Sequence, residues 1–345
     1  MKQDSIEKKT YSKNLLNIIK GAKNEKFLNL SFKKIKELPK ELGDLVNLKE
    51  LNISNNQLKK LPSEIGKLIN LEELNMPSNQ LQELPKEIGN LTNLLYLNLN
   101  DNQLQELQKE IGNLTNLRYL YIYNNQLQEL PKEIGNLTNL YNLDISNNQL
   151  KKLPSEIGNL TNLQELDVFN NQLQEIPKEI GKLTNLRRLF INNNNLQELP
   201  KEIEKLNNLE LLNISNNKLQ EIPKEIKKLL RLEILDISNN QLQKIPKEIK
   251  KFTNLQDLNM SNNKNMKGTL RLSTSELKRL NIENTRINEL IIPISNDLEY
   301  INIKNTTLKS LPQSICNKIK NDFMYMDIRH SYSNYNEMFK KLCTQ

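Results

Sequence analysis

Two aspartates, Asp144 and Asp167, have the type and spacing that could support acid–base chemistry. They occupy equivalent positions in two copies of a 23-residue pattern, so neighbouring strands could carry their carboxylates side by side, about 5 Å apart. That separation suits the carboxylate pair of a retaining glycosidase. However, Asp or Asn fills this position in most copies, and an open sheet offers no cleft that would raise the pKa of one member. The sequence therefore does not favour a catalytic or metal-binding role for the pair.

Other side chains with catalytic potential are sparse. His330 is the only histidine, and no cysteine or carboxylate cluster accompanies it at metal-ligand spacing. The nine glycines lie mostly in a repeated E-I-G turn and form no phosphate-binding loop. Cys316 and Cys343 are unclustered, so we expect free thiols rather than a disulfide, with Cys316 on the surface of a turn. We therefore expect no catalytic residue, no cofactor and no metal.

A 23-residue repeat organises most of the chain. The pattern is L-x-x-L-x-L-x-x-N-x-L, in which the alternation of apolar residues predicts one short strand for each copy. Regular copies begin at Leu48, Leu71, Leu94, Leu117, Leu140, Leu163, Leu186, Leu209, Leu232 and Leu255, and looser copies begin at Leu277 and Leu298. A single copy cannot bury its own leucines, so the copies are expected to stack.

This pattern resembles the leucine-rich repeat family, and its L-P-x-E-I-G-x-L-x-N-L half is similar to a subtype found in bacterial proteins and Ras-pathway scaffolds. The resemblance implies an α/β solenoid, a right-handed horseshoe whose concave parallel sheet has about 13–14 short strands and whose convex side has extended or 3₁₀ segments. The asparagine that ends each strand, such as Asn125, is expected to pair with backbone groups of neighbouring turns. Thr285 and Thr306 replace it in the loose copies, which predicts a less regular ladder there.

The predicted organisation is one solenoid with a helical cap at each end. Apolar residues recur at helical spacing near both termini, and Gly21 stands where the first helix would stop. The expected parts are a disordered segment over 1–10, a capping helix over 11–26, the solenoid over 27–329 and a C-terminal cap over 330–345. Within the solenoid the repeat is regular to about residue 254 and looser over 255–329.

Charge and hydropathy narrow the class of partner. Of the net charge of +8, residues 1–26 contribute +4 and residues 313–345 contribute +2, which leaves +2 for the repeats between them. Signs alternate along the Q-E-L-P-K-E-I motif, so nucleic acid is an unlikely partner. No apolar run is long enough for a membrane span, and the polar start is unlike a secretory leader. As written the chain is expected in the cytoplasm, or outside the cell if a leader was removed or a non-classical export route is used.

Aromatic residues interrupt the polar pattern of the exposed strand positions in five adjacent copies. The middle exposed position, usually Asn or Asp, becomes Tyr121 and Phe190. Aromatic side chains and Arg supply much of the binding energy at protein interfaces, so a contiguous group of them predicts a binding surface. The alternative is that the rings only pair across strands and stiffen the sheet. The predicted partner-binding residues are Tyr96, Tyr119, Tyr121, Tyr123, Tyr141, Asp144, Asp167, Phe169, Arg188 and Phe190.

A second, basic group near the C-terminus could suit an acidic partner. Its members are Lys278, Arg279, Tyr300, Lys304, Tyr325, Arg329 and His330. Together these features favour a non-enzymatic scaffold that binds a protein or peptide on its concave face around the fourth to eighth repeats. The alternative is a secreted or surface-exposed bacterial virulence factor or adhesin that binds a host protein or a glycan, because aromatic rings also stack on sugars.

Overall fold

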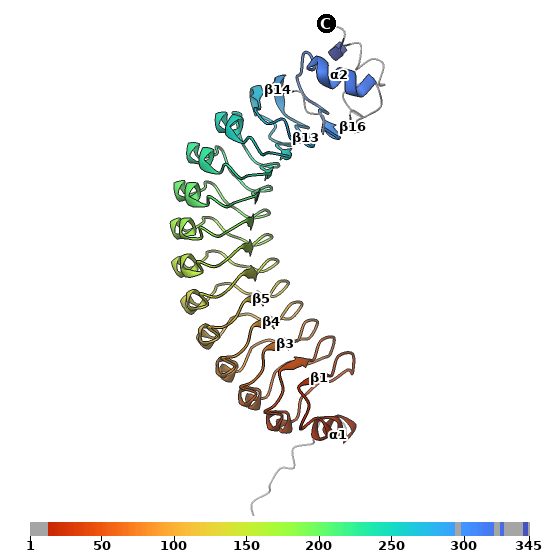
Figure 1. The fold of residues 1–345 in the computed structure, drawn as a ribbon, viewed down its shortest axis with the longest axis vertical. Coiled ribbons are helices and arrows are strands. Elements are labelled where there is room, and N and C mark those ends of the chain that lie inside the picture. The colour runs from red at the N-terminus through yellow and green to blue at the C-terminus, as the bar shows by residue number, and fades with distance from the viewer. Residues whose placement is uncertain (1–12, 294–297, 321–324, 328–340, 344–345) are drawn as a thin grey trace, which may run out of the picture. The chain divides into compact units, whose positions relative to one another are not determined.

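The computed structural model describes residues 13–293, 298–320, 325–327 and 341–343 of the 345-residue chain. The chain divides into two compact units, Met1–Leu163 and Gln164–Gln345. In each unit short parallel strands line one side and most of the helical turns line the opposite side (Figure 1). We call the exposed surface of the parallel sheet the strand face, and the opposite side the turn face.

The first unit begins with a helix and then alternates strands with 3₁₀ turns. The helix is α1 (Lys13–Gly21), and the strands are β1 (Phe27–Asn29), β2 (Glu50–Asn52), β3 (Glu73–Asn75), β4 (Tyr96–Asn98), β5 (Tyr119–Tyr121) and β6 (Asn142–Asp144). The turns are η1 (Lys40–Asp44), η2 (Ser63–Lys67), η3 (Lys86–Asn90), η4 (Lys109–Asn113), η5 (Lys132–Asn136) and η6 (Ser155–Asn159). Neighbouring strands pair in one register, so that Leu97 lies opposite Leu120.

The second unit continues this pattern and then departs from it. Its parallel sheet comprises β7 (Glu165–Asp167), β8 (Arg188–Phe190), β9 (Leu211–Asn213), β10 (Ile234–Asp236), β11 (Asp257–Asn259), β13 (Arg279–Asn281), β15 (Tyr300–Asn302) and β16 (Tyr325–Asp327). The turns are η7 (Lys178–Lys182), η8 (Lys201–Lys205), η9 (Lys224–Lys228) and η10 (Lys247–Lys251). After η10 the L-P-x-E-I motif is absent from the next two copies, and a two-stranded sheet of β12 (Lys267–Arg271) and β14 (Arg286–Ile291) precedes helix α2 (Gln313–Lys320).

The predicted fold class is confirmed. Among the described residues the parallel sheet has six strands in the first unit and eight in the second, and 3₁₀ turns join successive strands as far as β11. The core lies between the strands and the turns, where Leu120, Ile122 and Leu127 of one repeat are fully buried. These three side chains pack on the equivalent residues of the next repeat, as the spacing of the leucines predicts.

An asparagine ladder joins the successive turns. The Asn125 side-chain amide donates to the backbone oxygens of Leu99 (3.0 Å) and Ile122 (3.1 Å), and its Oδ1 accepts from the backbone amide of Leu104 (3.0 Å). One side chain thus pairs buried backbone groups of its own turn and of the preceding turn. The expected role of this column is confirmed, and Asn56 makes the same kind of contacts.

The threonines of the loose repeats cannot extend this ladder. The hydroxyl of Thr285 donates to the backbone oxygen of Ile282 (2.7 Å), and that of Thr306 to the oxygen of Ile303 (2.8 Å). Both acceptors belong to the threonine's own turn. A hydroxyl has one proton to donate, whereas an amide has two, so the threonine secures its own turn without reaching the preceding one.

Close packing of the turns explains the glycine of the E-I-G motif. A β-carbon at Gly112 would lie 2.5 Å from the backbone oxygen of Glu133 in the next turn, which is closer than packing allows. The equivalent position holds Glu204, Lys227 and Lys250 in η8, η9 and η10. There the ψ angle of the residue after the turn, 52–57° in η1–η7, rises to 60°, 64° and 89°. The angle is therefore nearly regular at η8 and η9, and it departs clearly from the regular value at η10.

The two ends of the solenoid are partly described. Helix α1 lies within the range predicted for a capping helix and buries Leu15 and Ile19 as it packs beside η1. Tyr11 falls outside the described residues, as do the segments 1–10 and 330–340. The backbone amide of Leu311 donates to the oxygen of Leu342 (2.9 Å), which attaches the described part of the C-terminal segment to the region before α2.

The prediction of free cysteines was wrong. Cys316 and Cys343 form a disulfide, and Cys316 is 1% exposed rather than on the surface of a turn. The reason is the position that Cys316 occupies, which is that of the E-I-G glycine. A side chain there points toward the place of a following turn, as the contact at Gly112 shows, and here the C-terminal segment with Cys343 reaches that place.

Replacing Asn125 with Ala should lower the free energy of unfolding by about 1–3 kcal/mol, because it leaves buried backbone groups of two turns without partners. The matched control is Asn116→Ala, since this exposed amide makes one bond, to the backbone oxygen of Thr92 (2.8 Å), and should cost less than about 1 kcal/mol. Urea unfolding followed by circular dichroism measures both values. Equal losses for the two variants would contradict the role of the ladder.

Candidate functional site

The strand face of the first unit presents tyrosines from two adjacent strands. The pleat of β5 points Leu120 into the core, where it is fully buried, and points its neighbours Tyr119 and Tyr121 outward. Tyr96 on β4 lies opposite Tyr119 in the ladder. Tyr141 immediately precedes β6. The sequence pattern therefore predicted correctly which face of the strand these residues occupy.

Four of the rings contact one another. The Tyr96 ring centroid lies 5.5 Å from that of Tyr121 and 6.3 Å from that of Tyr119. Tyr119 in turn meets Tyr141 edge to face, at 6.4 Å. We call Tyr96, Tyr119, Tyr121 and Tyr141 the tyrosine cluster. Tyr119 and Tyr141 are 40% and 36% exposed, so much of their ring surface remains open to a partner.

Two polar residues that the sequence pattern did not single out support the tyrosine cluster. The guanidinium of Arg118 lies 6.0 Å from the Tyr141 ring centroid, within range of a cation–π contact. The side-chain amide of Asn98 donates to the Tyr96 hydroxyl (3.4 Å). Arg118 precedes its strand, in a position that the alternation of the strand does not mark, so only the structure reveals this contact.

The local electrostatics keep the phenols protonated. Burial raises the pKa of Tyr96, an effect that the Asn98 hydrogen bond opposes and the Glu73 charge reinforces. Burial also raises the pKa of Tyr123. The charge of Asp101 and the hydrogen bond between the Tyr123 hydroxyl and Asp101 raise it further. Both hydroxyls are therefore hydrogen-bond donors at neutral pH and not nucleophiles or bases.

Asp144 ends β6, where it lies opposite Tyr121 in the ladder. Its Oδ1 accepts from the backbone amide of Ser146 (3.0 Å) and from the Ser146 hydroxyl (2.6 Å). Burial raises the pKa of the Asp144 carboxyl, although both bonds from Ser146 lower it. These contacts show a carboxylate that secures the bend after its strand, as an asparagine does in other repeats.

The remaining predicted residues of this group lie in the second unit. Arg188 on β8 is exposed, and its guanidinium lies 3.9 Å from the Glu165 carboxylate of β7. Phe190 is half-buried and stands in register with Asp167 on one side and Asn213 on the other. Phe169 is also half-buried, just after β7. The four predicted residues of this unit lie on the strand face of β7 and β8: Asp167, Phe169, Arg188 and Phe190.

The second predicted group divides into paired lysines and a polar hollow. The Lys278 ammonium donates to the Gln256 amide oxygen (2.9 Å), and Lys304 pairs with Glu283 (3.5 Å). Tyr325 belongs to β16, whereas Arg329 and His330 fall outside the described residues. The basic members whose side chains are described are therefore each set beside a polar or acidic neighbour.

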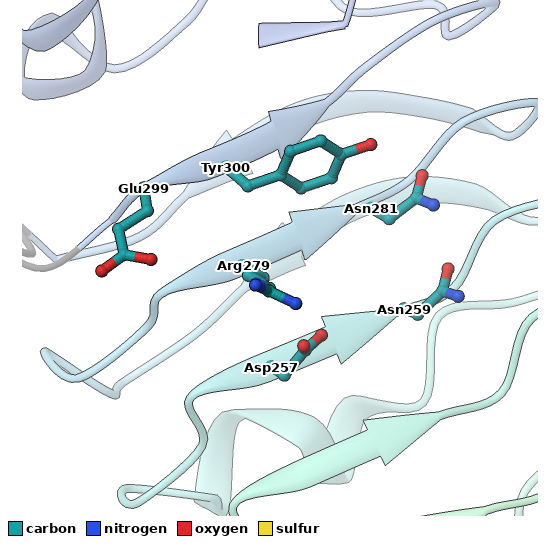
Figure 2. Close-up of a pocket in the computed structure, with 6 residues that line it drawn as sticks. All are labelled: Asp257, Asn259, Arg279, Asn281, Glu299 and Tyr300. Atoms are coloured by element: carbon teal, nitrogen blue, oxygen red, sulfur yellow. The ribbon is translucent and has the colours of Figure 1, made fainter. Parts of the chain in front are cut away.

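Arg279 and Tyr300 line a hollow of about 580 Å³ on the strand face of β11, β13 and β15 (Figure 2). Arg279 lies between Asp257 and Tyr300, and Glu299 stands at the entrance to β15 (Figure 2). Burial raises the pKa of Asp257, while the Arg279 charge lowers it. Sequence reasoning missed Asp257 and Glu299, because it followed the basic residues of these repeats. Their carboxylates give the hollow a mixed charge.

The side chains of the tyrosine cluster and of the polar hollow are of the kinds that bind a ligand without reacting with it. Within the described ranges no three His, Cys, Asp or Glu side chains are grouped as they would be around a metal ion. Nor does any helix in the described part of the chain combine the length and the apolarity needed to cross a bilayer. Aromatic rings, an arginine and hydrogen-bonding amides are the groups that the strand face offers to a ligand.

Comparison with known proteins gives one family throughout. The sequence matches the model of a leucine-rich repeat region over residues 7–109, 97–189 and 177–280. No curated protein matches it. A solved leucine-rich repeat protein of Leptospira interrogans is 34% identical, with 87% of this chain and 83% of that chain covered and a TM-score of 0.69.

Two other solved structures show the range of similar proteins. The functional domain of InlJ from Listeria monocytogenes is 25% identical, covering 83% of this chain and 67% of that chain, with a TM-score of 0.66. The plant peptide hormone receptor RGFR1, solved in complex with RGF2, is 28% identical over 89% of this chain and 59% of its own, with a TM-score of 0.60.

Asp144→Asn should stabilise the fold at neutral pH. Burial raises the folded-state pKa of the Asp144 carboxyl above its ordinary value of 3.8. The folded chain therefore binds the carboxyl proton more tightly than the unfolded chain does. The free energy of unfolding consequently falls as the pH rises from 3.8 through the folded-state pKa. Asparagine removes this cost and can keep the bonds from Ser146, because Asn213 accepts from Ser215 in the same way (3.1 and 2.8 Å).

Urea unfolding of wild type and Asp144→Asn, measured at about pH 7 and about pH 3, tests this prediction. The variant should be the more stable protein at the higher pH, and the difference should disappear at the lower pH. A stability difference that is the same at both values would exclude ionisation of Asp144 as its cause.

Proposed function

Because the chain belongs to the leucine-rich repeat family, we propose that it is a non-enzymatic interaction protein that binds a protein or peptide at the tyrosine cluster. The observation that carries this proposal is the contact among the rings of Tyr96, Tyr119, Tyr121 and Tyr141, which form a continuous aromatic group on the strand face. The family fold supplies the surface, and the cluster supplies apolar area that the fold does not need.

The arrangement of the rings favours binding over simple stiffening of the sheet. Tyr119 is 40% exposed although Leu120 beside it is fully buried, so the outer ring surface contributes little to the core. At the same position other repeats hold Glu50, Glu73 and Glu165. Rings that already contact one another lose little conformational freedom when a partner arrives, which makes them efficient anchors.

A segment with apolar and hydrogen-bonding groups is the partner that fits this surface. The Tyr96 hydroxyl accepts from Asn98, so its own proton can be donated to a backbone carbonyl of such a segment. Arg118 at one side of the cluster and Asp101 and Asp144 near Tyr123 add charges of both signs. The receptor RGFR1, which shares the fold, is solved in complex with the ligand RGF2, and this supports a peptide or protein as the class of partner.

The aromatic positions of the second unit are proposed as further contacts. Phe169 and Phe190 stand at positions that other repeats fill with small or polar residues, and Arg188 accompanies them on the same strand face. Arginine and phenylalanine bury a large area at interfaces. Their contribution can be separated from that of the tyrosine cluster by substituting them in a variant of their own, Phe169→Ser/Phe190→Ser.

The test uses a phage-displayed library of peptides selected on the wild-type chain. Peptides so selected should bind Tyr119→Glu/Tyr121→Asn, which restores residues common at these positions, at least tenfold more weakly than wild type, because loss of aromatic anchors costs more than about 1.4 kcal/mol. Isothermal titration calorimetry with synthetic peptides measures the affinities, after circular dichroism has shown that the variant is folded.

Ile234→Glu is the matched control. Ile234 stands at the position equivalent to Tyr119 in β10, and it is 38% exposed. This variant should bind the selected peptides as wild type does. If the peptides bind the tyrosine variant with undiminished affinity, the rings serve the sheet and the proposed site is wrong.

The disulfide favours the alternative of an exported protein that acts on a host protein or glycan. Disulfides persist in oxidising compartments and are rare in the bacterial and eukaryotic cytoplasm. Cys316 and Cys343 form a disulfide, so neither of these described cysteines is a free thiol. The tyrosine cluster suits this alternative too, because aromatic rings stack on the apolar faces of sugars.

The oxidation state of the two cysteines in the native cell distinguishes the compartments. Protein taken from cells under denaturing conditions and treated with an alkylating agent should show no added mass if it is exported, since the disulfide leaves no thiol to modify. Prior reduction should then give two additions, which controls for reactivity. Double alkylation without reduction would place the chain in a reducing compartment and contradict the exported alternative.

A further inference from the structure

Two adjacent turns of the second unit concentrate positive charge on the turn face. Both η9 and η10 read K-E-I-K-K, with three lysines against one glutamate, whereas η3, η4 and η5 read K-E-I-G-N, with one of each. Turn η8, with K-E-I-E-K, is balanced. We call η9 and η10 the lysine turns. Their exposed cations are Lys224, Lys227, Lys228, Lys247, Lys250 and Lys251.

The fold does not require these lysines. Lys227 and Lys250 occupy the position of the E-I-G glycine, where a β-carbon in a regular turn would lie 2.5–2.8 Å from the next turn. The ψ angle after the turn departs most from the regular value at η9 and η10. Long charged side chains thus stand where regular repeats hold no side chain at all, at the expense of close packing between turns.

Two further lysines lie on paired backbone segments beside the lysine turns. Strand β12 packs against η10, and a parallel bridge sets Lys244 next to Lys267. This backbone pairing places two lysines opposite each other, and like charges directly opposite are unfavourable unless an anion lies near them. Within the described residues the ion pair of this region joins Lys228 to Glu204 (3.0 Å), which leaves a large excess of positive charge on η9 and η10.

An exposed leucine lies next to this charge. Leu230 follows η9 and is 56% exposed, and Arg231 comes directly after it. The same position most often holds a threonine, such as Thr92 or Thr115, although Val46 and Ile69 are exposed apolar residues there in early repeats. A leucine flanked by Lys228 and Arg231 joins an apolar group to cations, which is the combination that suits the interface of a bilayer with anionic headgroups.

We propose that the lysine turns and Leu230 form a docking surface for an anionic lipid bilayer. The lysines attract the phosphates of the headgroups, and Leu230 enters the boundary between headgroups and acyl chains. A soluble polyanion would use the lysines equally well but would gain nothing from an exposed leucine, which is why the bilayer is the favoured occupant. The surface lies on the turn face, so it does not depend on the tyrosine cluster of the strand face.

The test is co-flotation of the full chain with vesicles of equal parts phosphatidylglycerol and phosphatidylcholine. Wild type should float with these vesicles and not with pure phosphatidylcholine, and added salt should weaken the association. Lys227→Gly/Lys250→Gly, which restores the glycine of the regular repeats, should partition roughly 30-fold more weakly. Leu230→Thr, which restores the usual threonine, should lose about tenfold.

Two controls separate this surface from general charge and from the strand face. Lys178→Gln/Lys201→Gln removes two lysines from η7 and η8, and it should change partition by no more than about threefold. Tyr119→Glu/Tyr121→Asn should float as wild type does, so failure of the protein-binding proposal would leave this result intact. Circular dichroism checks that each variant is folded.

Failure of wild type to float with the anionic vesicles would overturn the proposal. An unchanged partition of Leu230→Thr would also overturn it, because a surface that uses the lysines alone is a site for a soluble polyanion. Binding of a DNA duplex measured by fluorescence anisotropy, with a loss in the double lysine variant and none in Leu230→Thr, would establish that other occupant.

Discussion

The asparagine ladder is the constraint on which the rest of the structure depends. A strand of three residues pairs few backbone groups, and the loop that follows it would leave its amides and carbonyls buried without partners. Asn125 meets this requirement with bonds to Leu99, Ile122 and Leu104. These bonds tie each turn to the one before it, and they hold adjacent repeats of the regular part of the chain at a constant spacing.

The fixed spacing decides which positions are free to carry function. In the regular turns a β-carbon at Gly112 would meet Glu133, which explains the glycine that most repeats hold in that column. The outward positions of the strands meet no such limit, and Tyr119 and Tyr121 extend from β5 while Leu120 keeps the core intact. In the second unit this column also holds Lys227 and Lys250, and the backbone after the turn departs clearly from the regular geometry at η10.

Much of this could be predicted from the sequence because the repeat displays each structural role many times. The strands, the buried leucines and the ladder follow from the period. The paired asparagines hold two roles that the pattern alone does not separate: Asn124 takes a left-handed backbone (φ 56°), while Asn125 forms the ladder. The disulfide was missed because the two cysteines are far apart in the sequence and the chain was expected in the cytoplasm. The glycine position was also interpreted as exposed, although in the fold Cys316 is buried there and bonds to Cys343.

What the sequence could not supply is the relation between side chains of different repeats. The contact of Arg118 with Tyr141 joins residues 23 positions apart, and the polar hollow brings Asp257, Arg279 and Tyr300 together from three strands. Each position, considered alone, is an ordinary variation of its column. Each repeat supports the next through backbone groups, so the exposed side chains of neighbouring repeats can change together without loss of the fold. Surfaces with different chemistry can therefore arise on the strand face and on the turn face.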